Sequence, residues 1–157
     1  MNKIDIRMWD TETKRHTPFL EFGGMQSNNL MLTSVNNRVY DYALGKMILE
    51  FWIGLCDIND NKIYQADILK ITYMDKSSHV FERMKEHGDT EIFIILDVPS
   101  DYHTTTLRTH DEDKYFTGES QWGDSLMFLA YLIKSGAVEI VGNIHTHKIE
   151  NDKLVAL

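Results

Sequence analysis

Residues 51–71 read FWIGLCDINDNKIYQADILKI, and this stretch decides the fold. It begins inside an apolar run, residues 47–53, which suits a buried strand, and Gly54 follows that run. Residues 57–61 are rich in Asp and Asn, whose side chains bond to their own backbone and therefore favour turns. Residues 67–73 then alternate apolar with polar side chains and are rich in β-branched residues. The pattern predicts two strands that pair like a hairpin around the turn.

Elsewhere the chain carries two helix patterns and several strand patterns. The principal helix is expected over residues 124–135, with a capping residue at its start and Gly136 as a left-handed stop. A shorter helix is expected between Ser78, which can cap its first turn, and Gly88. These patterns predict a β-dominated α+β fold with one principal helix. The other expected strands cover residues 4–9, 91–98, 102–108 and 138–144.

The charge of the chain limits the partners that it can have. The chain has 157 residues, with 16 Lys and Arg against 24 Asp and Glu, so its formal net charge is −8. Proteins that bind nucleic acid take most of their affinity from clustered Lys and Arg, and the densest basic run, residues 14–16, stands beside acidic residues. The charge therefore argues against a nucleic-acid partner. It fits a solubilising acidic surface or, alternatively, an acidic face that mimics DNA or docks on a basic host protein.

The sequence also bears on the cellular compartment. Cys56 is the one cysteine, so an internal disulfide is excluded, and a lone thiol fits a reducing compartment. No His stands within a few residues of it, so we expect a buried, inert thiol rather than a nucleophile. The first ten residues lack the apolar core of a signal peptide, and the longest apolar stretch, residues 126–133, is too short to cross a bilayer. We expect a cytoplasmic protein.

Three segments of the chain resemble the YopX family of uncharacterised phage and prophage proteins: residues 4–10 (IDIRMWD), residues 51–71 and residues 138–145 (VEIVGNIH). The middle segment carries most of the resemblance. The family pattern there has an aromatic residue, Gly-Leu, a turn, Ile-Tyr and then Gly-Asp-Ile-Val at fixed offsets. The positions of this chain that match the family motifs are Trp9, Asp10, Gly54, Leu55, Asp57, Ile63, Tyr64, Asp67, Ile68, Gly142 and Asn143.

The resemblance implies a single YopX-like domain over residues 1–157 with an SH3-like barrel-type sheet core. Residues 1–15, 47–74 and 137–157 would form the core, and residues 75–136 would be an inserted elaboration. The family has no established activity, so the resemblance implies no catalytic residue and no cofactor. It implies structural roles for the matching positions and a place inside a bacterial host cell.

The chain departs from the family pattern at three positions. Asp60 and Ala66 stand where the family has Gly, and His145 stands where it has Tyr. Because Ala disfavours positive φ, we expect a different turn geometry and a different path into the strand that begins at Asp67.

His145 and His147 form the strongest candidate for a metal site. Residues i and i+2 of a strand point to one face, so both imidazoles would be able to bind one ion. The further ligands would have to come from His103, His110 or Asp111. The alternative, which we favour, is a solvent-exposed pair in a C-terminal tail.

Asp57, Asn59 and Asn61 have the spacing that begins a calcium-binding loop. Such loops need Gly at the sixth position and Glu at the twelfth, where this chain has Lys62 and Ile68. We therefore expect these side chains to close a turn by bonding to their own backbone.

A second group, Asp101, His103, His110 and Asp111, combines acids and imidazoles as general acid–base sites do. No nucleophile motif and no glycine-rich phosphate loop accompanies it in the sequence. We interpret it as the composition of a loop.

Large aromatic side chains offer contact surface. In a barrel of this kind some aromatic side chains line a groove and others fill the core. Trp52 lies inside an apolar run and is expected in the core. Trp122 has looser surroundings, with Gly and polar neighbours, so it is the candidate for contact with a partner. The full set is Trp9, Phe51, Trp52, Tyr64 and Trp122.

The sequence favours a non-enzymatic phage or prophage accessory protein that acts by contact with another protein or with itself. Eight methionines and the aromatic residues supply adaptable contact surface. Two alternatives stay open: a metal-dependent hydrolase or nuclease that uses His145 and His147, and a barrel module that binds nucleic acid. The absence of a basic run makes the second alternative the weaker one.

Overall fold

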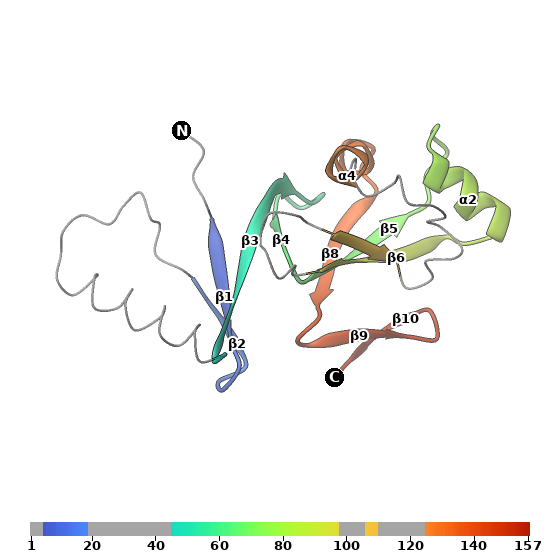
Figure 1. Ribbon diagram of the computed structural model, residues 1–157. Helices are drawn as coiled ribbons and strands as arrows, with labels where there is room; N and C mark the ends of the chain where they lie inside the picture. The colour runs from blue at the N-terminus through green and yellow to red at the C-terminus, as the bar shows by residue number, and fades with distance from the viewer. Residues whose placement is uncertain (1–4, 19–44, 98–105, 110–124) are drawn as a thin grey trace. The chain divides into compact units, whose positions relative to one another are not determined.

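The computed structural model describes residues 5–18, 45–97, 106–109 and 125–157 (Figure 1). The chain forms two compact units, Met1–Trp52 and Ile53–Leu157. Strands dominate the structure, and one sheet is curled into a half-barrel. The expectation of a β-dominated fold is therefore confirmed.

The first unit is built on an antiparallel sheet. Its strands are β1 (Ile6–Asp10), β2 (Arg15–Pro18) and the first half of β3 (Met47–Cys56), with β1 in the middle. Ile6 and Met8 are buried, as the alternating pattern predicts. The carboxylate of Asp10 closes the β1–β2 turn by accepting the backbone N–H groups of Glu12 and Thr13, at 2.9 and 3.1 Å.

The second unit contains an antiparallel sheet in the order β7-β6-β5-β8. The central strand β5 (Asp67–Thr72) pairs with β6 (Glu91–Asp97) on one side and with β8 (Val138–Asn143) on the other. Four further strands are short. β4 (Lys62–Tyr64) pairs with β3, and β7 (Thr106–Thr109) pairs with β6. β9 (His147–Glu150) and β10 (Lys153–Ala156) pair with each other in a hairpin.

Two helices cover this sheet on one side (Figure 1). The N-cap of α2 (His79–His87) is Ser78, whose side chain accepts from Val80 N, and Gly88 ends the helix at φ +71°, as the sequence predicts. α4 (Ser125–Lys134) is followed by Gly136 at φ +81°. The core of the unit joins both helices to the sheet. Its buried members include Ile63, Leu69, Ile71, Phe81, Met84, Ile92, Ile94, Leu96, Leu129, Leu132 and Val138.

The predicted hairpin between residues 47–53 and 67–73 is wrong, because residues 67–73 are not the strand that pairs with residues 47–53. The turn at residues 57–61 leads from β3 into β4, and β5 belongs to the other sheet. β4 is only three residues long, too short to show a period in the sequence. A second turn after Tyr64 then carries the chain from β4 into β5.

The C-terminal hairpin was not expected, because its residues were interpreted as a tail. Asn151 and Asp152 join β9 to β10 and have φ of +51° and +61°. Two adjacent residues with positive φ are the geometry of the tight turn that matches the twist of paired strands. Asn and Asp tolerate this conformation better than other non-glycine residues, so the pair is a signal that the sequence does contain.

The different turn geometry expected at Asp60 and Ala66 stays a prediction, but its premise, that Ala66 avoids positive φ, is wrong. Both residues adopt positive φ, +63° and +75°, the conformation that glycine takes easily. Ala66 is held from both sides, since its N–H donates to Leu96 O at 2.8 Å and its carbonyl accepts from Ile144 N at 2.9 Å. These tertiary hydrogen bonds outweigh the local preference of alanine.

Asp57 ties the β3–β4 turn to β8. Its Oδ1 accepts the backbone N–H groups of Asn59 and Asn61 at 3.0 and 2.9 Å, and its Oδ2 accepts that of Ile140 at 2.9 Å. The register of β5 against β8 shifts so that Val141 is an extra residue, a β-bulge next to Ile140. Asp57 is 6% exposed, so one buried carboxylate satisfies three amides in two distant segments.

We expect Asp57→Asn to lower the free energy of unfolding by about 2–4 kcal/mol, because an amide nitrogen in place of one oxygen of this buried side chain faces a backbone N–H and leaves both without an acceptor. Urea unfolding measures the change. Asp60→Asn is the control, since Asp60 is an exposed residue of the same turn and Asn tolerates positive φ. Equal stability of the two variants would contradict the assigned role of Asp57.

Candidate functional site

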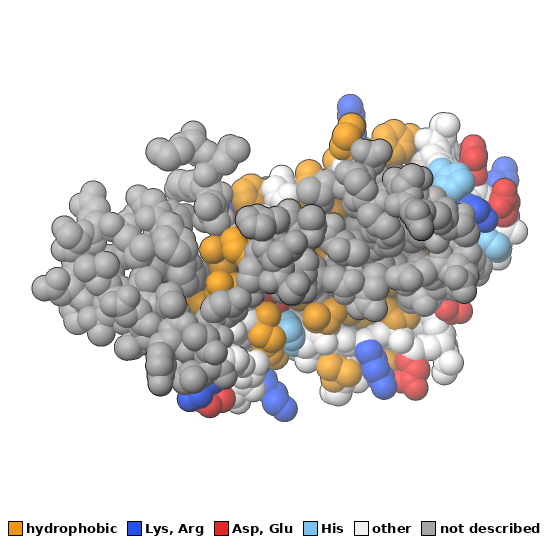
Figure 2. Space-filling view, in the orientation of Figure 1, with side chains coloured by type: hydrophobic (Ala, Val, Ile, Leu, Met, Phe, Trp, Pro, Cys, Tyr) orange, Lys and Arg blue, Asp and Glu red, His pale blue; other side chains and the backbone are white. Residues whose placement is uncertain are grey.

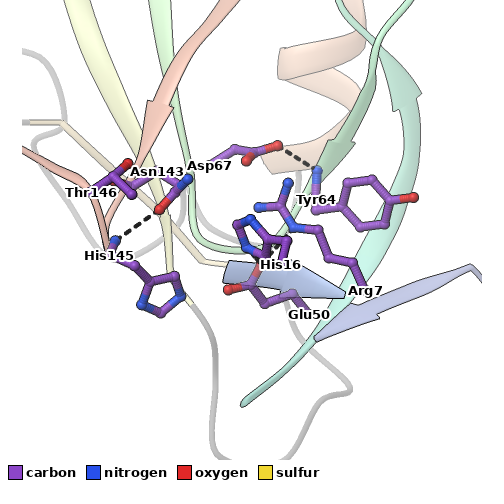
Figure 3. Close-up of polar contacts among 8 residues, drawn as sticks. All are labelled: Arg7, His16, Glu50, Tyr64, Asp67, Asn143, His145 and Thr146. Atoms are coloured by element: carbon purple, nitrogen blue, oxygen red, sulfur yellow. Dashed lines mark hydrogen bonds and ion pairs between the residues drawn. The ribbon is translucent and has the colours of Figure 1, made fainter. Parts of the chain in front are cut away.

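The main cluster of charged side chains in the first unit is built around a buried carboxylate on its sheet. Glu50 lies in the middle of β3 and has no exposed surface. Its Oε2 accepts from Arg7 Nε at 2.6 Å and lies 3.0 Å from His16 Nε2 (Figure 3). Three strands thus each contribute one member of the cluster.

The strand register explains why these side chains meet. Arg7 is the partner of Glu50 across β1 and β3, and Trp9 is the partner of His16 across β1 and β2. Arg7 and Trp9 are two residues apart on β1, so both point to the same face. The rings of Trp9 and His16 meet edge to face with centroids 4.9 Å apart.

The chemistry of this cluster is that of a cross-strand charge pair. The guanidinium of Arg7 neutralises the charge of Glu50. The Oε2 atom of Glu50 contacts both Arg7 Nε and His16 Nε2. A general base needs a carboxylate oxygen directed at the proton that it removes. The arrangement therefore favours a structural role in holding β2 and β3 against β1.

The sequence analysis did not single out this cluster. The signal was a lone charged residue inside an apolar run, because Glu50 interrupts residues 47–53. A charged residue is rarely buried without a partner, so this pattern is the available signal for a cation on a neighbouring strand. Which strand supplies the cation is a matter of long-range pairing, and the local pattern does not contain it.

Most of the polar family-motif positions bond to nearby backbone (Figure 3). Asp67 Oδ2 accepts from Tyr64 N at 2.8 Å, across the turn between β4 and β5. Asn143 Oδ1 accepts from His145 N at 3.0 Å and starts the turn after β8. Asp57 and Asp10 cap turns in the same way. The apolar positions Trp9, Ile63 and Ile68 are buried, Leu55 packs against the core, and Gly54 has φ +88° within β3.

His145 and His147 do not stand on one strand, so the geometry expected of a metal-binding pair is wrong. His145 lies in the turn between β8 and β9, and His147 is the first residue of β9. His147 Nδ1 lies 2.7 Å from Thr146 Oγ1, and its ring lies against Gly142. In the described ranges no group of three or more clustered acidic, Cys or His ligand atoms includes His147.

The other sequence candidates divide between the described and undescribed parts of the chain. The turn interpretation is confirmed for Asp57, whose carboxylate accepts the backbone N–H groups of Asn59 and Asn61. Cys56 is partly exposed, so the expectation of a buried thiol is wrong, and Trp52 is also only partly buried. The candidates outside the described residues are Asp101, His103, His110, Asp111 and Trp122.

An exposed apolar pair marks the outer face of α4. Met127 is 76% exposed and Tyr131, one turn later, is 44% exposed. The opposite face of the helix buries Leu129 and Leu132 in the core, so the outward side chains are held on a fixed element. Tyr131 also donates its hydroxyl hydrogen to Ser77 O at 2.5 Å. Figure 2 shows hydrophobic side chains at the surface over this helix.

Neither protein-family models nor curated proteins gave a match to this sequence. The YopX resemblance, the single domain over residues 1–157 and the SH3-like core therefore stay predictions. Within the residues that the structure describes, no helix is both long enough and apolar enough to span a lipid bilayer.

We expect Glu50→Gln to lower the free energy of unfolding by roughly 1.5–3 kcal/mol, because it removes the buried negative charge that pairs with Arg7. Glu139→Gln is the control: Glu139 pairs with Lys70 at 3.3 Å but is 42% exposed, and exposed pairs contribute about 0–1 kcal/mol. Chemical denaturation of both variants measures the difference. A Glu50→Gln effect no larger than the control would show that the cluster does not hold the sheet together.

Gly142→Ala should destabilise the protein by about 1–3 kcal/mol, because no space is left for a side chain. An added Cβ would lie 2.8 Å from His147 Nδ1. Removing that ring with His147→Ala should recover most of the loss, which a double-mutant cycle of unfolding free energies measures. The same loss in the presence and absence of the His147 ring would rule out this contact as the cause.

Proposed function

We propose that this protein is a phage or prophage accessory protein that acts by protein–protein contact rather than by catalysis. The observation that carries the proposal is the outer face of α4, where Met127 and Tyr131 are exposed on a rigid helix. The YopX resemblance supports the phage origin. The use of the buried acids for structure supports a non-catalytic role.

The composition of the α4 face suits binding. Tyr is enriched among the residues that dominate interface energies, and Met adapts its flexible side chain to irregular partner surfaces. A helix already fixed by Leu129 and Leu132 loses little conformational freedom when a partner binds. Binding energy would therefore go into contact rather than into ordering the surface.

The described acids offer less support for a reaction. Glu50 is paired with Arg7, and Asp57 accepts three backbone N–H groups. Groups engaged in this way stabilise strands and turns, and changing their protonation would cost structure. This distribution of polar groups favours contact over acid–base chemistry.

Met127→Glu should abolish partner binding and leave folding stability within about 0.5 kcal/mol of wild type, since the side chain is on the surface. Immobilised wild-type, Met127→Glu and Glu86→Ala proteins would be incubated with bacterial lysate, and light scattering would report self-association. Glu86 is an exposed residue of α2 and serves as the control. A lysate protein or self-assembly lost only with Met127→Glu supports the proposal. A monomeric wild-type protein that retains nothing would refute it.

A further inference from the structure

We infer that two copies of this chain pair through β10, edge to edge, and so join their C-terminal hairpins into one antiparallel sheet. The occupant of the edge is a second copy, and the surface differs from the α4 face on which the proposed function rests. The inference follows from the hydrogen-bond register of the hairpin. Addition of a strand to an open sheet edge is a recurring mode of protein recognition.

β10 is an edge strand. It pairs with β9 in a two-stranded sheet (Figure 1), and no other strand of the described ranges pairs with it. The edge of β8, in contrast, is occupied, because Ile140 N donates to Asp57 and Val138 O accepts from Ile58 N. An edge strand presents a row of backbone N–H and C=O groups with which another strand can pair. β10 therefore offers a template that β8 does not.

The register of the hairpin shows which groups of β10 face outward. Hydrogen bonding alternates along an antiparallel pair, so every second residue bonds to the neighbouring strand. Leu157 N donates to Thr146 O at 2.9 Å, which places Leu157 among the residues that bond toward β9. The residues two and four positions earlier bond to the same side. The backbone groups of Leu154 and Ala156 therefore point away from β9.

These outward groups are self-complementary under a two-fold axis. Two antiparallel copies of β10 can align Leu154 of each copy with Ala156 of the other, so that both outward residues of both copies exchange backbone hydrogen bonds. Val155 then faces the partner's Val155 at the axis. A register that aligns Leu154 or Ala156 with its own counterpart uses only one outward residue of each strand. The first register is therefore the most stable one.

Side chains and charge fit the same register. β-branched residues that lie opposite one another stabilise a strand pair, as Val155 and the partner's Val155 would. Lys153 faces the partner's Leu157, a residue that is 70% exposed in one copy, so like charges do not lie opposite each other. Residues 147–156 contain two Lys and two acidic residues, so the hairpin is neutral although the chain carries −8. Repulsion between copies therefore arises elsewhere in the chain and is screened by salt.

The size of this interface predicts a weak dimer. β10 has four residues, and stable interfaces bury about 800 Å² on each partner, more than so short a strand supplies. We expect a Kd of roughly 10 μM to 1 mM that decreases at higher salt, because salt screens the repulsion between the acidic copies. Sedimentation equilibrium of the full chain measures this constant.

Cysteine cross-linking tests the register. In a Cys56→Ser background, which removes the natural thiol, Val155→Cys should form an intermolecular disulfide under mild oxidation. Opposite residues at such a position have Cα atoms about 4.5 Å apart, within the range that a disulfide spans. Lys153→Cys is the matched control on the same face of β10, and its two copies would lie about 14 Å apart.

We expect at least about tenfold more covalent dimer at position 155 than at position 153, since Cα atoms more than about 7 Å apart are not bridged. A denaturing gel without reductant measures the yields. Equal yields at the two positions, or no covalent dimer at position 155, would overturn the inference.

Ala156→Pro tests the outward hydrogen bonds. Proline lacks an N–H, and the N–H lost at position 156 points outward, so the bonds between β10 and β9 remain. We expect the Kd to rise about tenfold or more, whereas Ala156→Ser, which keeps the N–H, should leave it unchanged. A wild-type chain that is monomeric at about 1 mM would overturn the inference. So would a dimer that Met127→Glu removes and Ala156→Pro does not, a result that would assign self-contact to α4 and support the proposed function.

Discussion

The Asp57 carboxylate is the point at which distant parts of the second unit are joined. It accepts N–H groups from the turn that follows β3 and from Ile140, which lies 83 residues further along the chain. Ile58 N adds a hydrogen bond to Val138 O in the same place. The Asp57 carboxylate that accepts these amides is itself buried, and leaving such an amide without an acceptor costs about 1–3 kcal/mol. The end of β3, the start of β4 and the middle of β8 therefore depend on one side chain.

The bulge in β8 follows from this anchor and shapes what comes after it. Ile140 is bound by Asp57, Val141 is the extra residue, and Gly142 resumes the pairing with β5. The absence of a side chain at Gly142 then makes room for the ring of His147, the residue at which the C-terminal hairpin begins. Just beyond the bulge, the N–H of Ile144 donates a hydrogen bond to the carbonyl oxygen of Ala66. This hydrogen bond helps to hold the alanine at φ +75°. A strained conformation of this kind persists only where the surroundings over-determine it.

The elements that the sequence predicted are those with local signals. The hydroxyl of Ser78 and the left-handed Gly88 mark both ends of α2, and the β-branched run that forms β6 reads as a strand without reference to the rest of the chain. The pairing of β5 with β6 and β8, rather than with β3, depends on contacts between distant residues, which no local period records. The same limit applies to Glu50, whose partners lie on β1 and β2. The predicted geometry of His145 was wrong for a related reason, because His145 lies within the turn that follows Asn143 and His147 lies on the next strand.

Core packing explains the inner face of α4 but not its outer face. Leu129 and Leu132 are fully buried, and burial of such side chains contributes roughly 1.5–3 kcal/mol each to stability, so packing alone accounts for the inner face. Packing does not account for Met127, which leaves most of its surface in water, or for the exposed ring of Tyr131. Single exposed apolar residues are common, but here two lie one turn apart on a helix whose position is fixed by the core. Since Glu50 and Asp57 bond to strands and turns, this outer face is the part of the described surface on which the proposed contact rests.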